Sequence, residues 1–128
     1  MNFNLTDEQK MLQKMIREFA EEVVAPGAIE RDHTKEFPKE IFKQLGEMGI
    51  MGLPFEETYG GAGSDTISFA IVTEELSKAC ASTGITYSAH ISLGGAPLHL
   101  FGTKEQKEKF LTPICTGESF GAFGLTEH

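Results

Sequence analysis

The sequence predicts an all-α fold, a bundle of about five to six helices that ends in a short β-strand-like tail. Three observations support this prediction. Apolar residues recur every three or four positions along most of the chain, which is typical of helices packed on one side. Two segments open with a helix capping box, and only the last stretch, SFGAFGLT, loses the helical period. A chain of 128 residues has room for one such domain.

The first helix is predicted to begin at the capping box of Thr6 and Gln9. Two adjacent rows of apolar residues follow, Met11, Met15, Phe19 and Val23 beside Leu12, Ile16, Ala20 and Val24. Pro26 and Gly27 interrupt this pattern, and proline removes a helical hydrogen bond. We therefore expect the helix to bend or stop just before them, and residues 29–34 to form a frayed, charged turn.

A second helix is expected to start near Pro38 and to end at Gly49, since proline suits a first turn and glycine a helix C-terminus. Its inward-facing residues are Ile41, Phe42, Leu45 and Met48. Glycine and proline mark residues 50–63 as a loop, which is expected to pack through Leu53, Phe55 and Tyr59. This is not a phosphate-binding loop, because no Gly-Lys-Ser/Thr follows its glycines.

The third helix is capped by Ser64 or Asp65. Phe69, Val72, Leu76 and Ala79 or Cys80 are expected to face inward, and Glu74, Glu75 and Lys78 outward. Neighbouring carboxylates on a helix diverge by about 100°, so such a pair does not share one reacting atom. The acidic pairs are interpreted as solvated surface.

Residues 82–102 contain no charged residue, so the sequence predicts that they lie mostly buried. They alternate in part like a strand, but a helical stripe extends further along them, formed by Ile85, Ala89, Leu93, Ala96 and Leu100. We interpret them as a helix capped by Ser82 or Thr83 and kinked at Pro97. Small residues on this helix let another backbone, or an elongated apolar ligand, approach closely.

A last helix is expected to begin at the capping box of Thr103 and Gln106 and to be terminated by Pro113 and Gly117. Phe110, Leu111 and Ile114 are expected to be buried near its end. The stretch after Gly117 is typical of the first strand of a β-structure. A lone strand has nothing to pair with, so the sequence indicates a piece of something longer.

Composition argues against several classes of function. A net charge of −8, with basic residues dispersed among carboxylates, disfavours nucleic acid and anionic membranes as partners. Glycine, proline and histidine interrupt residues 82–102 too often for membrane insertion. Cys80 and Cys115 stand alone, which indicates reduced thiols in a cytoplasmic protein, with neither a disulfide framework nor a metal site. No export signal and no constellation of catalytic residues is recognised.

Four motifs, in their order and spacing, resemble the acyl-CoA dehydrogenase family: YGGAG at 59–63, EELSKACAS at 74–82, FGTKEQKEKFL at 101–111 and GAFGLTE at 121–127. The resemblance covers essentially the whole chain. It implies that residues 1–117 are the family's N-terminal helical domain and residues 118–128 the truncated start of its middle β-domain. His128 stands where the family has proline.

The resemblance implies an FAD enzyme that oxidises fatty acyl-CoA to trans-2-enoyl-CoA, passes electrons to an electron-transfer flavoprotein and forms a homotetramer. The family's catalytic glutamate lies in a C-terminal helical bundle, so no catalytic residue is expected here, and this fragment alone is expected to be inactive. Two other interpretations stay open. One is a stand-alone helical module that binds an apolar ligand or partner, and the other is the same fold in an acyl-CoA oxidase or flavin monooxygenase.

The resemblance also implies particular site residues. Those that match the family's flavin-contacting motif are Phe123, Leu125 and Thr126. Those that match the lining of its acyl-chain tunnel are Thr86, Ala89, His90 and Leu93. Ordinary helix packing is the alternative for these four, and for His90 that alternative is a buried, hydrogen-bonded imidazole.

Overall fold

A computed structural model describes residues 3–126, so the expectation for His128 lies outside the described residues. The helices within this range form six continuous rods and one short 3-10 turn. The rods are α1 (Asp7–Phe19) with the π-helical η1 (Ala20–Val24); α2 (Ala28–Thr34); α3 (Lys39–Glu47); α4 (Thr66–Ala79); α5 (Ala81–Ala89), π-helical η3 (His90–Gly95) and α6 (Ala96–Phe101); and α7 (Lys104–Gln106), π-helical η4 (Lys107–Leu111) and α8 (Thr112–Thr116). The 3-10 turn is η2 (Glu57–Tyr59). The all-α prediction is confirmed.

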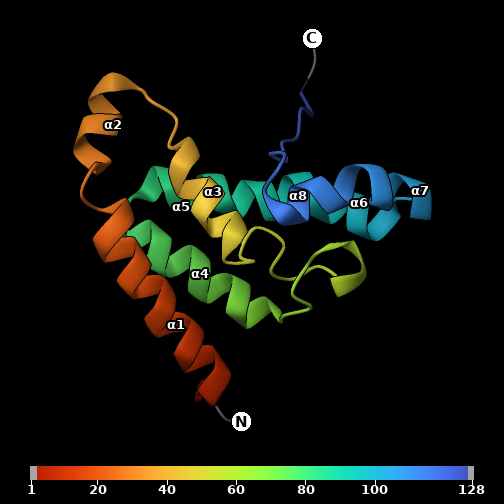
Figure 1. Cartoon of the computed structure of the whole chain (residues 1–128), viewed down its shortest axis with the longest axis horizontal. Coiled ribbons are helices and arrows are strands. Elements are labelled where there is room, and N and C mark those ends of the chain that lie inside the picture. The colour runs from red at the N-terminus through yellow and green to blue at the C-terminus, as the bar shows by residue number, and fades with distance from the viewer. Residues whose placement is uncertain (1–2, 127–128) are drawn as a thin grey trace.

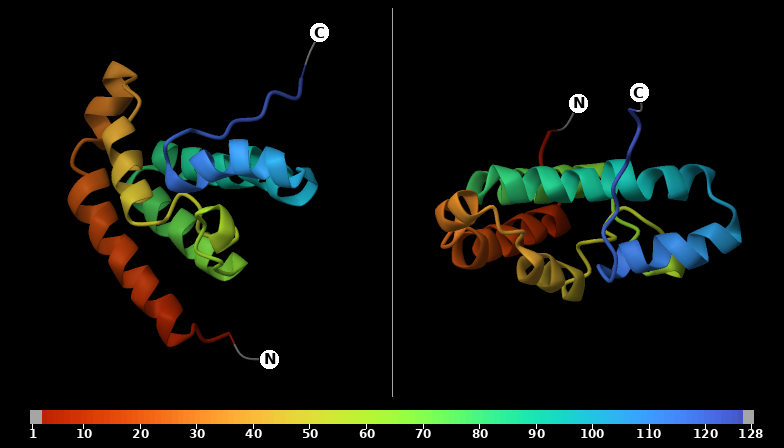
Figure 2. Two further views of the ribbon diagram at one scale, coloured as in Figure 1. Left: turned by 45° about the vertical axis from the view of Figure 1, so that its right-hand side comes forward. Right: turned by 90° about the horizontal axis from the view of Figure 1, so that it is seen from above.

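The rods lie in two layers (Figures 1 and 2). The long rod of α5, η3 and α6 lies with α4 in one layer, and α1, α3 and α8 lie in the other. Helix α4 packs against both α1 and α5, while α8 contacts α3 and η3. No helix among residues 3–126 is both long enough and apolar enough to span a lipid bilayer.

One core cluster lies between the layers. Side chains from α1, α3, the loop after α3, α4 and α5 meet there, and the largest of them are completely buried: Ile16, Phe42, Met51, Leu76 and Tyr87. The Tyr87 hydroxyl donates a hydrogen bond to the Ile50 carbonyl oxygen at 3.2 Å, and burial raises its pKa. Leu53, Phe55 and Tyr59 are buried too, which confirms that the loop packs against the helices.

The first rod begins as predicted, because Thr6 and Gln9 form both hydrogen bonds of the capping box. The row that contains Ile16 faces the core, whereas the other row reaches the core only through Phe19 and Val23. Ile16 is fully buried, whereas Met11 is 72% exposed and Met15 42% exposed. The charged turn predicted after Pro26 is instead a regular helix, α2. Arg31 of that helix donates to the Val24 carbonyl oxygen, which ties α2 back to the end of η1.

The α5–η3–α6 rod differs from its prediction in two ways. Neither Ser82 nor Thr83 is its N-cap; Cys80 is, at the corner where α4 ends and α5 begins. The expected burial of the whole stretch is also wrong. Thr83, Gly84, Tyr87, His90, Ile91, Gly94 and Gly95 are buried, whereas the predicted stripe lies outward, with Ile85 and Leu100 each 66% exposed. The backbone widens into a π-helix just before Pro97, which occupies the first turn of α6.

The last rod begins at the predicted capping box of Thr103 and Gln106. Leu111 and Ile114 are buried, but Phe110 is 47% exposed, so its predicted burial is wrong. Pro113 does not end the rod; it lies in the first turn of α8, directly after the π-helical η4. Gly117, with a positive φ of 78°, ends it as expected.

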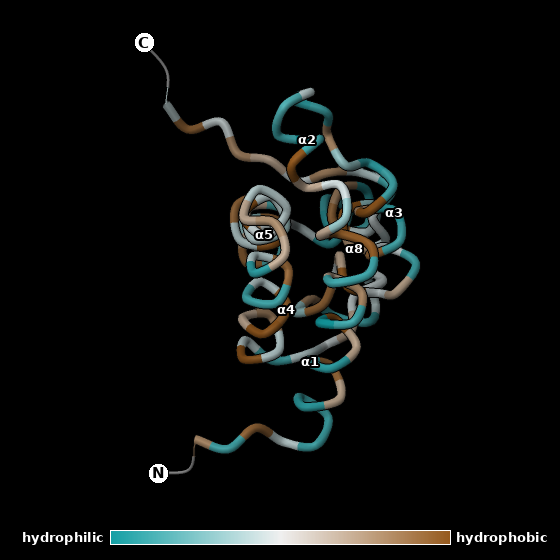
Figure 3. Tube along the Cα trace, turned by 90° about the vertical axis from the view of Figure 1, so that its left-hand side faces the viewer, coloured by the Kyte–Doolittle hydropathy of each residue, from teal (hydrophilic) through white to brown (hydrophobic). Residues whose placement is uncertain are grey.

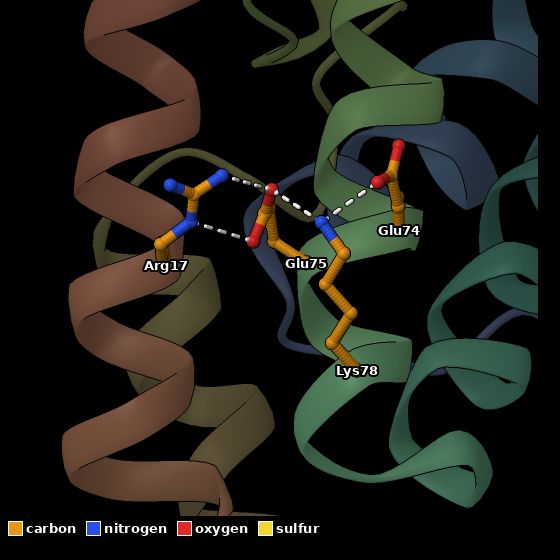
Figure 4. Close-up of polar contacts among 4 residues, drawn as sticks. All are labelled: Arg17, Glu74, Glu75 and Lys78. Carbon is orange, nitrogen blue, oxygen red and sulfur yellow. Dashed lines mark hydrogen bonds and ion pairs between the residues drawn. The ribbon is translucent and has the colours of Figure 1, made fainter.

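An ion pair between the half-exposed Arg17 and the buried Glu75 joins α1 to α4 (Figure 4). The Arg17 guanidinium donates to both carboxylate oxygens of Glu75, Nη2 to Oε1 at 2.9 Å and Nε to Oε2 at 3.1 Å. Lys78 Nζ lies 3.0 Å from Glu75 Oε1 and 2.7 Å from Glu74 Oε1. Glu75 was predicted to face solvent, yet its side chain is only 2% exposed. Hydrogen bonds from Arg17 contribute most to a lowered pKa of Glu75.

Replacing Glu75→Gln should destabilise the chain by about 1–3 kcal/mol, because the buried side chain loses the charge that Arg17 and Lys78 contact. The lowered pKa means that the carboxylate's contribution is complete above its ordinary value near 4.5 and is lost as the pH falls through the lower folded value. Urea denaturation of wild type and variant at several pH values measures both effects. Glu74→Gln is the matched control, since that side chain is 60% exposed and should change the free energy of unfolding by less than about 0.5 kcal/mol.

Candidate functional site

The candidate site lies where the C-terminal tail crosses the α5–η3–α6 rod. At this crossing His90, the first residue of η3, is 1% exposed and holds three backbone segments. Its Nε2 lies 3.0 Å from the Met51 carbonyl oxygen and 3.1 Å from the Ile114 carbonyl oxygen. Its Nδ1 accepts a hydrogen bond from the Gly121 N–H at 3.0 Å. One imidazole thus connects the loop after α3, helix α8 and the tail.

These partners fix the protonation state of His90. A ring nitrogen that accepts from a backbone N–H carries no proton, so Nδ1 is the acceptor and Nε2–H donates to the two carbonyl oxygens. Burial lowers the pKa of His90, and the two carbonyl contacts oppose this shift. The side chain is therefore a neutral structural link, in agreement with the packing alternative from the sequence.

Two glycines allow the tail to come this close. Gly94 of η3 lies directly against Gly121, and a Cβ atom on either residue would overlap the other's backbone. The sequence indicated small residues that let another backbone approach this rod, and the tail is such a backbone. The sequence did not reveal that the approaching backbone would be the tail, although both the rod and the tail are visibly rich in glycine.

The tail also packs against the helices through an aromatic residue, Phe120, just before this crossing. The Phe120 ring meets Phe37 edge to face at a centroid distance of 5.1 Å and Phe42 at 5.3 Å, and it lies 6.0 Å from the His90 ring. Beyond the crossing the tail extends away from the helices and carries apolar residues with it (Figure 3). No residue from 118 to 126 is in a β-strand, because no second strand lies beside it in the described part of the chain.

The crossing creates a groove of about 480 Å³ between the rod and the tail. Leu93, Pro97 and Leu98 line it from the rod, Phe110 and Pro113 from the last rod, and residues 119–123 from the tail. Two site residues predicted from separate motifs, Leu93 and Phe123, therefore share one cavity. Both are about half exposed, Leu93 at 48% and Phe123 at 53%.

The other predicted residues are distributed around this groove. Thr86 lines a second groove of about 280 Å³ near the start of α5, and its hydroxyl donates to the Ser82 carbonyl oxygen at 2.8 Å. Ala89 is partly exposed one turn before Leu93. Leu125 and Thr126 lie further along the tail, where Leu125 is 76% exposed. The structure thus brings Leu93 and Phe123 together and leaves Leu125 and Thr126 on the protruding tail.

Residues 3–126 contain no cluster of histidine, cysteine, aspartate and glutamate that could hold a metal ion. The perturbed carboxylate of Glu75 is fully engaged by Arg17 and Lys78, so it is a structural group. Within residues 3–126 the site consists of apolar walls and a protruding tail.

Comparison with known proteins identifies the domain. The family model of the acyl-CoA dehydrogenase N-terminal domain matches residues 6–118, and the chain belongs to this family. A probable acyl-CoA dehydrogenase of Bacillus subtilis is 54% identical over 127 residues, which are 99% of this chain and 33% of that protein. The chain spans about a third of the length of the curated relatives it matches.

Solved structures share the fold. A chain from a structure of the electron transferring flavoprotein of Acidaminococcus fermentans matches with a TM-score of 0.94 and 48% identity, over 99% of this chain and 33% of that one. Butyryl-CoA dehydrogenase from Megasphaera elsdenii matches at 0.92 and 47%, over 99% and 34%. An acyl-CoA dehydrogenase from Bacillus anthracis, solved in complex with FAD, matches at 0.90 and 37%, over 97% and 21%.

Gly94→Ala should release the tail, because the new methyl group would occupy the space of the Gly121 backbone. Hydrogen exchange of the Gly121 amide measures this directly, since that N–H is bonded to His90 in the wild type. We expect at least about tenfold faster exchange, which corresponds to about 1.4 kcal/mol of lost protection. Gly124→Ala is the control, because no atom lies within 4 Å of a Cβ there. Unchanged protection in Gly94→Ala would show that the crossing is loose.

Proposed function

We propose that this chain is the N-terminal domain of an FAD-dependent acyl-CoA dehydrogenase that oxidises fatty acyl-CoA to trans-2-enoyl-CoA. The observation that supports this most is the single groove lined by Leu93 and Phe123, because one belongs to the proposed acyl-chain wall and the other to the proposed flavin motif. The family membership and the flavin named for the Bacillus anthracis structure agree with it. In this proposal the domain contributes walls, and the acid–base residue lies elsewhere in the protein.

The residues of the groove fit an elongated apolar chain beside a planar ring. Leu93, Pro97 and Phe110 offer apolar surface, while Gly94 and Gly121 add no side-chain bulk. On the tail, Phe123, Leu125 and the Thr126 hydroxyl would contact the flavin from an extended backbone. When bound, FAD supplies a hydride acceptor. The role of His90 is then to hold the tail in place through Gly121, at the edge of the acyl-chain wall.

The domain boundary is part of the same proposal. In this proposal residues 1–117 are the helical domain and residues 118–128 the start of the middle domain. Helix α8 ends at its C-cap Gly117 and residues 118–126 lie in no helix, which supports this boundary. An electron-transfer flavoprotein as electron acceptor, a homotetrameric assembly and a cytoplasmic location complete the proposed function. The likeness to a chain in the Acidaminococcus fermentans flavoprotein structure supports the first of these.

A second candidate is a helical module that binds a partner through its apolar face. The outward row on the α5–η3–α6 rod favours it, since Ile85, Leu93 and Leu100 are all at least 48% exposed. The same row is equally suited to contact with further domains of a longer protein.

The decisive experiment compares residues 1–128 with a polypeptide of full family length that carries them at its N-terminus. We expect the long polypeptide, loaded with FAD, to reduce a dye acceptor in the presence of butyryl-CoA or octanoyl-CoA. We expect residues 1–128 alone to show neither turnover nor tight FAD binding. Turnover by residues 1–128, or none by the long polypeptide with either substrate, would contradict the proposal.

Ala89→Phe in the long polypeptide should shorten the preferred acyl chain, because a ring at this position would overlap the distal carbons of a long substrate. The ratio of kcat/KM for octanoyl-CoA to that for butyryl-CoA should fall at least about tenfold. Ala70→Phe, the same change at an exposed position of α4, should leave the ratio unchanged. An unaltered ratio in Ala89→Phe would remove Ala89 from the acyl-chain wall.

A further inference from the structure

One hydrogen bond holds the end of the tail against the rod. The last backbone–backbone hydrogen bond before it runs from the Ser119 N–H to the Pro113 carbonyl oxygen at 2.9 Å. For residues 120–126 of the described chain, the bond from the Gly121 N–H to His90 Nδ1 at 3.0 Å is the only hydrogen bond to the helices. The side chains of the tail beyond Gly121 are largely exposed. The position of residues 121–126 therefore depends mainly on one imidazole.

The glycine contact at the crossing does not replace this hydrogen bond. Gly94 and Gly121 meet through backbone atoms, so their contact buries no side chain between them. Phe120, directly before the crossing, is held by the rings of Phe37 and Phe42 at 5.1 Å and 5.3 Å. Glycine has more backbone freedom than any other residue, because it has no Cβ atom. The tail thus has a fixed residue at 120, and the residue that follows it can turn.

The hydrogen bond to the tail requires an unprotonated Nδ1. Nε2 carries the proton that is directed at the Met51 and Ile114 carbonyl oxygens, at 3.0 Å and 3.1 Å, so a second proton can go only to Nδ1. That proton would face the Gly121 N–H, and two donors cannot share a hydrogen bond. The protonated ring still donates to both carbonyl oxygens. The change therefore falls on the tail, and the links to α8 and to the loop after α3 remain.

The elements around His90 contain few groups that titrate. The Tyr87 hydroxyl on the rod and the Cys115 thiol on α8 stay neutral, because burial raises the pKa of each. Residues 50–55 of the loop and 119–126 of the tail contain no titratable side chain, and α3 turns apolar residues inward. Lys109 is the one charged residue among the described residues that line the groove, and its Nζ lies over the Phe110 ring at 5.0 Å. No carboxylate in these surroundings would pair with a protonated ring.

We propose that protonation of His90 detaches residues 121–126 from the rod, and that the detached segment turns about Phe120. The attached form has no proton on Nδ1 and the detached form binds one, so acid favours the detached form. Burial holds the pKa of His90 in the attached form below its ordinary value. At pH values below the pKa of a solvated imidazole, about 6.5, each pH unit should raise the ratio of detached to attached chains about tenfold.

Detachment would open the groove. Phe123 belongs to the segment that moves, whereas Leu93 on the rod does not, so the groove that they share would lose one wall. This inference does not depend on the proposed activity, and its tests use neither flavin nor acyl-CoA. A negative result would therefore leave the proposed function in place, and inactivity of the long polypeptide would leave the inference in place.

The test uses tryptophan as a reporter, because the sequence contains none. Phe123→Trp places it on the wall of the groove, and its quenching by acrylamide is followed in residues 1–128 from about pH 8 to about pH 5. We expect quenching to increase as the pH falls, while far-UV circular dichroism shows unchanged helix content. Constant quenching, or loss of helix over the same pH range, would overturn the proposal.

Two histidine variants of this reporter chain identify the group that titrates. His90→Asn keeps an oxygen that can accept from the Gly121 N–H but takes up no proton in this pH range, so quenching should not change with pH. His99→Gln is the matched control, because His99 contacts Phe55 and lies 3.8 Å from Glu56, and it should keep the transition. The same transition in His90→Asn, or its loss in His99→Gln, would contradict the proposal.

Nuclear magnetic resonance of the unsubstituted chain requires no variant to fold. The Gly121 amide and the His90 ring nitrogens should change together, with one midpoint below about 6.5, because they are the two sides of one hydrogen bond. The Phe120 ring should keep its contacts with Phe37 and Phe42 across the transition. Different midpoints for Gly121 and His90, or a Phe120 ring that leaves together with Gly121, would show that the inference is wrong.

Discussion

The imidazole of His90 joins three stretches of backbone that are far apart in the sequence, and the tail keeps its place through that link. Met51 and Ile114 supply carbonyl oxygens to one ring nitrogen, and Gly121 supplies an N–H to the other. The ring is 1% exposed, so its loss would leave the two carbonyl oxygens and the Gly121 N–H without these partners in a largely buried place. A neutral ring is required, because a second ring proton would face the Gly121 N–H.

The groove is a consequence of this link. The tail lies over Gly94 because His90 holds Gly121 there and because neither glycine has a side chain in the way. Phe120 then packs against the rings of Phe37 and Phe42, which fixes the direction in which the tail leaves the helices. The Gly94–Gly121 backbone contact, the His90 hydrogen bond and the Phe120 ring contacts therefore together place the tail beside the rod.

Local signals were enough to predict much of this fold. Both capping boxes, the loop that packs through Phe55 and the helix end at Gly117 follow from short-range hydrogen bonding and backbone geometry.

The wrong predictions concern residues whose environment is set by contacts that are distant in the sequence. Glu75 is buried because Arg17 of another helix neutralises it, and sequence spacing does not reveal that partner. The exposed stripe on α5 to α6 was misplaced because the rod turns Tyr87, His90 and Gly94 inward, against partners that lie far away in the sequence. The shared groove of Leu93 and Phe123 likewise depends on a crossing that no local pattern encodes.

The place of Gly121 in the chain gives this architecture an order of assembly. A ribosome releases all the helices described here before it releases the tail, and helical segments can pack as they emerge. In a nascent chain that has emerged only as far as α8, Nδ1 of His90 therefore lacks the hydrogen bond from Gly121. The backbone at Gly94 is then not covered by the tail. The wall of the groove closes only when translation has moved past the helical part, so maturation of the site is coupled to the progress of synthesis.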